Sequence, residues 1–272
     1  MFRGFYTAAA GMLTQQRHAE MLANNIANAN TPGYKADRSA MRAFPEMLLA
    51  RIEKHNGAPQ IAQIGSVNTG AYMQELIPQF TQGDIHATDL PTDVALVEEN
   101  VPYHEETNLK GALFFAVQTP EGEVKYTRNG HFTIDNEGRL MMAGNYVLST
   151  NGTPIVITGN DFTITPEGDV FENGIDTGQT IDIRLAADVR NLINEGNGLF
   201  RTADGTVLAS AVGIGNVQYT LRQGFLERSN VDVAKAYTDM MTAYRTFEAN
   251  QKVLQAYDRS MDKAVNEIGR IG

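Results

Sequence analysis

The 272-residue sequence contains no cysteine and no tryptophan. The absence of cysteine excludes disulfides, thiolate metal sites and thiol catalysis. Every apolar run is far shorter than the roughly 20 residues that a membrane-spanning helix needs, so we expect no membrane insertion. The formal net charge of −10 argues against broad contact with nucleic acid.

Recognisable catalytic and metal-binding motifs are also missing. The five histidines show neither His-x₃-His nor His-Glu-x-x-His spacing, and the sequence has no Gly-x-Ser-x-Gly elbow and no phosphate-binding loop. Two acidic doublets remain, Glu98-Glu99 and Glu105-Glu106, but adjacent residues of an extended segment point to opposite faces. We therefore expect no catalytic residues, no metal and no cofactor, and a protein that is not an enzyme.

The composition itself is that of an ordinary soluble protein, with 42% hydrophobic and 20% charged residues. The first residues, Met1 to Phe5, lead into a helical pattern rather than into the apolar stretch of a cleaved leader. The sequence thus predicts either a cytosolic protein or one exported without a cleaved signal peptide.

The strongest pattern lies at the C-terminal end, from Ser229 to Gly272. Six apolar residues recur there at intervals of seven, which is typical of a coiled coil. These seam residues are Val233, Met240, Phe247, Leu254, Met261 and Ile268. We expect Ser229 to cap the helix, with Asp232 completing a capping box. A helix of about forty residues would span roughly 60 Å and would require a partner.

A shorter amphipathic helix is predicted for residues 5–29, where Phe5, Met12, Ala19 and Ile26 follow the same spacing. Its last turns are rich in asparagine and end in the turn Thr31-Pro32-Gly33. Two interpretations stand side by side: a frayed, solvated helix end, or side chains placed to hydrogen-bond a backbone.

The middle of the chain lacks the regular helical spacing of the two ends. The sequence suggests a short helix around Ala40 to Ile52, followed by a polar, glycine-spotted stretch. From Tyr72 to Tyr219, short runs rich in Val, Ile, Phe and Thr alternate with turns, which predicts β structure. Four turns share one chemistry that favours a type I turn followed by a left-handed glycine: 119–122, 135–138, 165–168 and 202–205.

The predicted fold class is α+β, with long N- and C-terminal coiled-coil-type helices bracketing a central, mostly β domain rich in hairpins. The expected boundaries are residues 1–35 for the N-terminal helix, 36–71 for an extended linker, 72–228 for the β domain and 229–272 for the C-terminal helix.

The terminal motifs resemble those of bacterial flagellar basal-body rod and hook proteins. Residues 23–35 (ANNIANANTPGYK) are similar to the N-terminal signature of that family, and residues 223–233 (QGFLERSNVDV) with 244–251 (YRTFEANQ) are similar to its C-terminal signature. Residues 82–96 and 126–132 look like the central domain of its distal-rod subgroup.

The resemblance implies a structural subunit of the flagellar rod that self-assembles through its terminal helices. The implied partners are copies of itself, other rod and hook proteins, and the flagellar export apparatus, and the implied location is the basal body. In addition to the seam, the implied assembly residues of the N-terminal motif are Asn24, Asn25, Ile26, Asn28, Asn30, Thr31, Pro32, Gly33 and Tyr34.

Three alternatives stay open from the sequence. The first is an envelope-associated enzyme that acts on peptidoglycan, based on the β domain and the acidic doublets. The second is a hook-side axial protein, and the third is a cytosolic coiled-coil adaptor.

Overall fold

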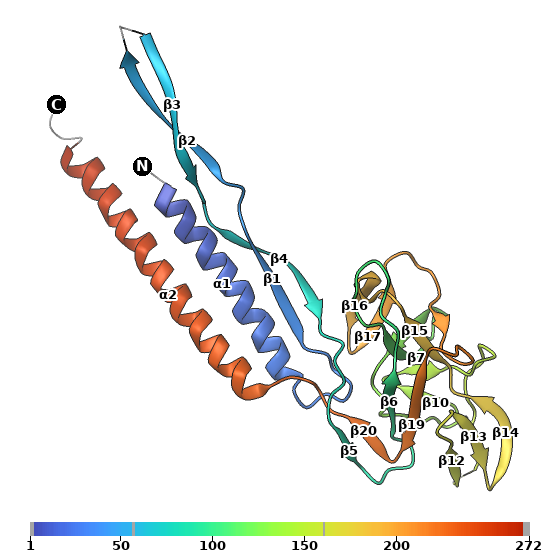
Figure 1. Ribbon diagram of the computed structural model, residues 1–272. Coiled ribbons are helices and arrows are strands. Elements are labelled where there is room, and N and C mark those ends of the chain that lie inside the picture. Colours follow the sequence, from blue (N-terminus) through green and yellow to red (C-terminus); the bar gives the residue numbers. More distant parts are fainter. Residues whose placement is uncertain (1–2, 56–57, 160, 269–272) are drawn as a thin grey trace. The chain divides into compact units, whose positions relative to one another are not determined.

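The computed structural model describes residues 3–55, 58–159 and 161–268 (Figure 1). The chain forms two compact units. Unit 1 comprises Met1–Ala27, Asp37–Ile77 and Asp232–Gly272, and unit 2 comprises Asn28–Ala36 and Pro78–Val231. Each unit is therefore built from segments that lie far apart in the sequence.

Two antiparallel helices form one part of unit 1: α1 (Arg3–Ala27) and α2 (Val233–Lys263), which lie side by side (Figure 1). The rings of Phe5 and Tyr257 meet edge to face, with their centroids 6.5 Å apart. A Cβ atom on Gly4 would lie 2.0 Å from the Tyr257 hydroxyl, so the tyrosine side chain packs directly against the backbone of α1 at Gly4. Further along α1, Gly11 lies against Asn250 of α2.

The start of α2 differs from the prediction. Asp232, not Ser229, is the N-cap, and its carboxylate accepts a 3.0 Å hydrogen bond from the backbone N–H of Lys235. The α-helix ends at Lys263 and continues as a π-helical turn, Ala264–Ile268.

The predicted fold class is wrong in its helical part. Instead of long coiled-coil-type helices, the chain has one helix of 25 residues and one of 31 residues. Strands occupy more of the chain than helices do. Within α2, the only fully buried side chains among the described residues are Ala236 and Ala243, while Val233 of the expected seam is 40% exposed. The physical reason is that a spacing of seven also arises in any amphipathic helix of a few turns, because the 3.6-residue period drifts only slightly over each heptad.

The middle segment of unit 1 is made of strands. Strand β1 (Asp37–Ala43) pairs with β4 (Ala71–Pro78), and β2 (Met47–His55) pairs with β3 (Ala58–Val67) in an antiparallel hairpin. The predicted short helix at 40–52 is therefore wrong. The stretch 36–71, expected to be an extended linker, contains β1, β2 and β3.

Unit 2 is a β structure with one large sheet, ordered β16-β17-β8-β7-β11-β10-β9, with β15 between β7 and β18. The strands of this sheet are β7 (Ala112–Gln118), β8 (Val124–Thr127), β9 (Thr133–Ile134), β10 (Leu140–Met142), β11 (Asn145–Val147), β15 (Ile183–Ala186), β16 (Leu192–Gly196), β17 (Leu199–Thr202) and β18 (Ala209–Ser210). A 3₁₀ turn, η1 (Val189–Asn191), precedes β16.

Three smaller sheets complete unit 2. They are β12-β13-β14 (Phe162–Ile164, Asp169–Glu172 and Ile175–Thr180), β19-β6 (Gln218–Gln223 and Val94–Asn100) and β20-β5 (Phe225–Glu227 and Ile85–Ala87).

The core of the molecule lies in unit 2. Strand β7 is buried on both faces from Ala112 to Val117, with Phe115 on one side packed against Phe132. On its other side Phe114 meets Phe80 and Phe200, each pair of ring centroids being 5.5 Å apart.

The four predicted turns are confirmed. In each, the N–H of the glycine donates to the carbonyl of the residue three positions earlier, and the glycine has a positive φ. These glycines are Gly122, Gly138, Gly168 and Gly205, with φ between 66° and 105°.

Candidate assembly site

The N-terminal motif is divided between the two units, with Asn24, Asn25 and Ile26 in unit 1 and the residues from Asn28 to Tyr34 in unit 2. Asn25 is buried at the last turn of α1. Its side-chain amide donates to the carbonyl of Asp37 (2.9 Å) and its oxygen accepts from the N–H of Asp37 (3.0 Å). Asn25 thus holds the start of β1 against the end of α1, while Asn24 is exposed and Ile26 is half-buried.

The turn that follows is fixed within unit 2. Thr31 donates from its hydroxyl to the side-chain oxygen of Asn28 (3.2 Å), and the N–H of Tyr34 donates to the carbonyl of Thr31 (3.3 Å). Gly33 has a φ of 68° and donates its N–H to the carbonyl of Glu227 (2.8 Å). A Cβ atom on Gly33 would lie 2.5 Å from the carbonyl oxygen of Arg128.

The remaining motif residues reach a hollow on unit 2. Exposed Asn30 and half-buried Pro32 line a pocket of about 320 Å³ together with His86 and Arg228. The Arg228 side chain therefore places a positive charge at this pocket, beside the N-terminal motif.

A buried charge cluster lies where the two signatures meet in unit 2, and the sequence did not single it out. Lys35 donates from Nζ to Glu227 Oε1 (2.7 Å) and to the carbonyl of Thr81 (2.8 Å). Arg128 donates from Nε to Glu227 Oε2 (2.7 Å) and from Nη1 to Glu98 Oε1 (2.7 Å). All four side chains are 2–3% exposed.

Two cations and two carboxylates balance in this cluster. Burial lowers the pKa of the Lys35 ammonium to about 8, and the nearby Arg128 guanidinium adds to that effect against the attraction of Glu227. Burial alone would raise the pKa of Glu227, but Arg128 and Lys35 together lower it below its ordinary value. The pKa of Glu227 is lowered because this carboxylate faces two cations. The Lys35 ammonium is buried and faces the Arg128 cation as well as its carboxylate partner, so its pKa is lowered too.

Asn230 of the C-terminal signature adds a second link to the N-terminal segment. Its side-chain oxygen accepts from the N–H of Ala36 (2.7 Å), and its amide donates to the carbonyls of Gln79 (2.7 Å) and Thr81 (3.1 Å). The two terminal signatures therefore hold each other in unit 2 through one buried ion pair and several backbone contacts.

The C-terminal seam lies on α2 in unit 1. Met240, Phe247, Leu254 and Met261 are half-buried, and Val233 is exposed. Ile268 ends the π-helical turn, and its side chain lies outside the described residues.

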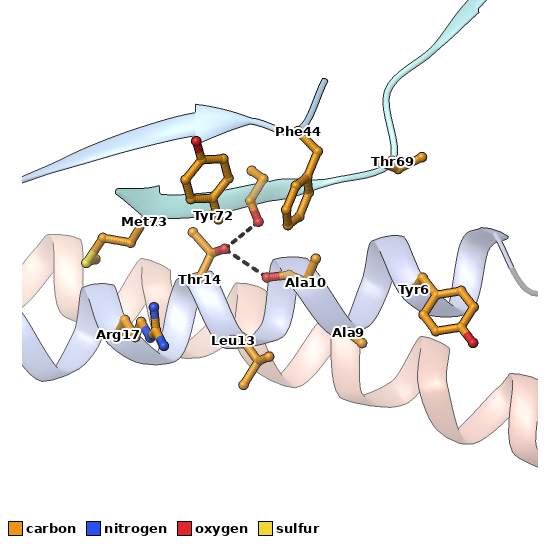
Figure 2. A pocket seen from close by; sticks show the side chains of 11 residues that line it. Tyr6, Ala9, Ala10, Leu13, Thr14, Arg17, Phe44, Thr69, Tyr72 and Met73 are labelled. Carbon is orange, nitrogen blue, oxygen red and sulfur yellow. Dashed lines mark hydrogen bonds between the residues drawn. The ribbon is translucent and has the colours of Figure 1, made fainter. Parts of the chain in front are cut away.

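Unit 1 also carries a mostly apolar groove between α1, the start of β4 and Phe44, which follows β1 (Figure 2). Its volume is about 420 Å³, and its lining includes Tyr6, Leu13, Phe44 and Tyr72, with Arg17 at one end. Thr14 ties the helix to β4, because its hydroxyl lies 2.8 Å from the carbonyl oxygens of Ala10 and Ala71. No signal in the sequence pointed to this groove.

Of the two acidic doublets, Glu105-Glu106 is exposed, whereas Glu98-Glu99 makes contacts with other side chains. The Glu98 carboxylate binds Arg128, and its neighbour Glu99 accepts a 2.6 Å hydrogen bond from the Thr220 hydroxyl. Within the described ranges, no three His, Asp or Glu side chains gather as a metal site would require. Over the same ranges, neither helix is both long and apolar enough to cross a membrane.

Comparison with known proteins identifies the family. Residues 5–35 match the family described as flagella basal body rod protein, residues 108–172 the flagellar hook protein FlgE/F/G D1 domain, and residues 222–267 the flagellar basal body rod FlgEFG protein C-terminal family. These ranges include both terminal signatures and part of the β unit.

Full-length relatives agree. The chain is 56% identical over 272 residues to the flagellar hook-basal body complex protein FlhO of Bacillus subtilis, covering all of both chains. It is 32% identical to the flagellar basal-body rod protein FlgG of Borreliella burgdorferi, over 98% of each chain. It is also 29% identical to the rod protein FlgF of Escherichia coli, over 97% of each chain. The protein belongs to the flagellar basal-body rod and hook protein family, as a structural subunit located in the basal body.

Proposed function

We propose that this subunit joins the rod through unit 1, using the apolar residues of its terminal helices. The observation that carries the proposal is the uneven distribution of the core. Both hydrophobic core clusters found among the described residues lie in unit 2. Both helices of unit 1 leave large apolar side chains in water, such as Leu13 (56% exposed) on α1 and Met241 (52% exposed) on α2.

The seam residues of α2 fit this role. Met240, Phe247, Leu254 and Met261 are only half-buried, so a neighbouring subunit would remove further apolar area from water. Of the N-terminal motif, Asn25 and Gly33 support assembly indirectly by fixing the chain's own path. Exposed Asn30 and half-buried Pro32 are placed to contact neighbours.

The partners we propose are further copies of this chain, other rod and hook proteins, and the flagellar export apparatus. Contacts that repeat head to tail without closing produce a filament. Such an assembly requires no catalytic site, and we propose that the protein is not an enzyme.

The experiment exchanges a half-buried seam residue for a charge. Phe247→Asp should abolish incorporation into basal bodies and motility, because a carboxylate would be buried without a partner in the assembly. Ala249→Asp is the matched control, since Ala249 is exposed on the same helix. The circular dichroism of both purified variants should retain the β signal of unit 2. Normal swimming of the Phe247→Asp strain would contradict the proposal.

The enzyme alternative has its own assay. Purified protein is incubated with cell-wall sacculi, and we expect no release of muropeptides. Release that Glu99→Gln or Glu105→Gln removed would establish a hydrolase instead.

A further inference from the structure

The walls of the pocket beside the N-terminal motif are fixed by backbone hydrogen bonds within unit 2. The N–H of Gly33 donates to the carbonyl of Glu227 (2.8 Å), which holds the turn that closes the motif. The N–H of Arg228 donates to the carbonyl of Asp84 (2.8 Å), and His86 lies on β5, which is paired with β20. Arg228 and His86 line the pocket, whereas Asp84 is not among its lining residues. The pocket is thus shaped by the chain itself, as binding sites for small groups usually are.

The guanidinium of Arg228 differs from those of the other arginines of unit 2. Arg222 stacks over the ring of Phe225, with its Cζ 4.5 Å from the ring centroid. Among the described residues, the exposed Arg228 side chain has no carboxylate, hydrogen-bond or ring partner. Its N–H donors are therefore available to a ligand. The remaining arginines of unit 2 all form ion pairs with carboxylates: Arg128, Arg139, Arg184, Arg190 and Arg201.

The rest of the polar lining can also donate hydrogen bonds. His86 carries a ring N–H in either neutral tautomer, Asn30 a side-chain amide and Ser229 a hydroxyl. No carboxylate occurs among the described residues that line the pocket, and Ala29 and Pro32 add an apolar wall. One permanent cation among neutral donors fits a group that carries a single negative charge.

We propose that this pocket binds a carboxylate on a short aliphatic stem. The Arg228 guanidinium takes both carboxylate oxygens in a bidentate pair, His86 and Asn30 donate to the remaining lone pairs, and the stem packs against Ala29 and Pro32. A phosphate carries close to two negative charges at neutral pH and is balanced less well by one guanidinium.

Two sources supply such a group: a free short-chain carboxylic acid, and the aspartate or glutamate side chain of a protein partner. The site lies wholly in unit 2, so the inference goes beyond the proposed assembly through unit 1 and does not depend on it.

Binding is measured on the purified full chain with sodium butyrate as the probe. Nuclear magnetic resonance of the histidine rings follows the titration, and the His86 signals should shift until they saturate. His131 is the internal control, because it is bound to Asp93 and lies outside the pocket, so its signals should stay in place. Butanol, which has the same stem without the charge, should cause no saturable shift.

Variants of the arginine test which side chain holds the carboxylate. Arg228→Gln should weaken butyrate binding at least about tenfold, because the charge-assisted pair is lost. Arg228→Lys keeps the charge without the planar fork and should give an intermediate affinity. Arg222→Gln is the matched control and should bind as the wild type does. Both arginines are exposed, so the circular dichroism of all three variants should be unchanged.

Three results would overturn the carboxylate site: no saturable shift of His86, equal affinity of Arg228→Gln and the wild type, or tighter binding of inorganic phosphate than of butyrate. Each of them leaves the proposed assembly through unit 1 intact. Conversely, normal swimming of the Phe247→Asp strain would refute that assembly and leave the butyrate titration unaffected.

The source of the carboxylate is identified by labelling arginines with phenylglyoxal, followed by mass spectrometry. With a protein partner as the source, Arg228 should be protected in washed, intact basal bodies and reactive in the free subunit, while Arg222 reacts in both. With a free carboxylic acid as the source, Arg228 should react in both preparations and be protected only when butyrate is added. Reaction of Arg228 in the free subunit that butyrate does not slow would contradict the site.

Discussion

The Lys35 ammonium lies 2.7 Å from a carboxylate oxygen of Glu227, although 192 residues separate them in the chain. Both side chains are 2% exposed, and Arg128 binds the other oxygen of the same carboxylate. Removing either partner therefore leaves a charge in an environment that cannot solvate it.

Lys35→Met should destabilise unit 2 by about 3 kcal/mol, because one guanidinium is then left with two buried carboxylates. Chemical denaturation followed by the β signal in circular dichroism measures the change. Lys110→Met is the matched control, since Lys110 is 44% exposed and 3.3 Å from Glu98, and it should cost less than about 1 kcal/mol. Equal effects of the two variants would contradict a special role for the buried pair.

The pH dependence of stability should contain a contribution from Glu227. Its pKa in the folded state lies below the ordinary glutamate value because of Arg128 and Lys35, despite the opposing effect of burial. The unfolded state therefore binds more protons, and the contribution is fully present above the unfolded pKa, about 4.5, and is lost as the pH falls through the folded pKa. We expect the free energy of unfolding of Glu227→Gln to decline less steeply on acidification. Parallel curves for the variant and the wild type would refute this.

Asn25→Ala should destabilise unit 1 by about 1–3 kcal/mol, because both the N–H and the carbonyl of Asp37 lose their side-chain partner. Asn30→Ala serves as the control from the same motif, as Asn30 is exposed and a loss of less than about 0.5 kcal/mol is expected there. Hydrogen exchange of the Asp37 amide gives the local readout, and unchanged protection in Asn25→Ala would contradict the role of this side chain.

Gly33→Ala should destabilise the protein for two reasons. A φ of 68° costs an L-residue about 1–2 kcal/mol, and the new Cβ would lie 2.5 Å from the Arg128 carbonyl oxygen. Gly144→Ala isolates the first penalty, because Gly144 has a φ of 87° and no atom within 4 Å of an added Cβ. Thermal unfolding should show a larger loss for Gly33→Ala, and equal losses would mean that the backbone around Arg128 yields without cost.

Local chemistry made part of the fold predictable. The turn at Asp135 to Gly138 follows from its own four residues, and so do the other three turns of that type. The strand β2 is not predictable from residues 40–52, because Met47, Leu48 and Leu49 show no clear alternation and the pairing that makes β2 a strand comes from Ala58–Val67. The heptad spacing is present in α2, but spacing alone does not reveal that Ala236 and Ala243 are buried while the larger seam residues stay partly exposed.

The candidate assembly site, like the fold, can be predicted from the sequence only in part. Lys35 and Glu227 both fell inside the terminal motifs, yet nothing in a linear sequence indicates that they form a pair. Their partner Arg128 lies in a third segment. Similarly, the groove beside α1 exists only because β4 returns to the helix at Ala71, a contact that depends on the whole of unit 1.

The Lys35–Glu227 contact also constrains the order in which the chain folds. Closing a loop of nearly two hundred residues carries a larger entropic cost than closing the hairpins between β7 and β19, since this cost rises with loop length. The β hairpins should therefore form first, and residues 28–36 should dock afterwards onto an existing surface. We expect the reverse path in unfolding, with the N-terminal segment detaching while the sheet around Phe115 is still intact.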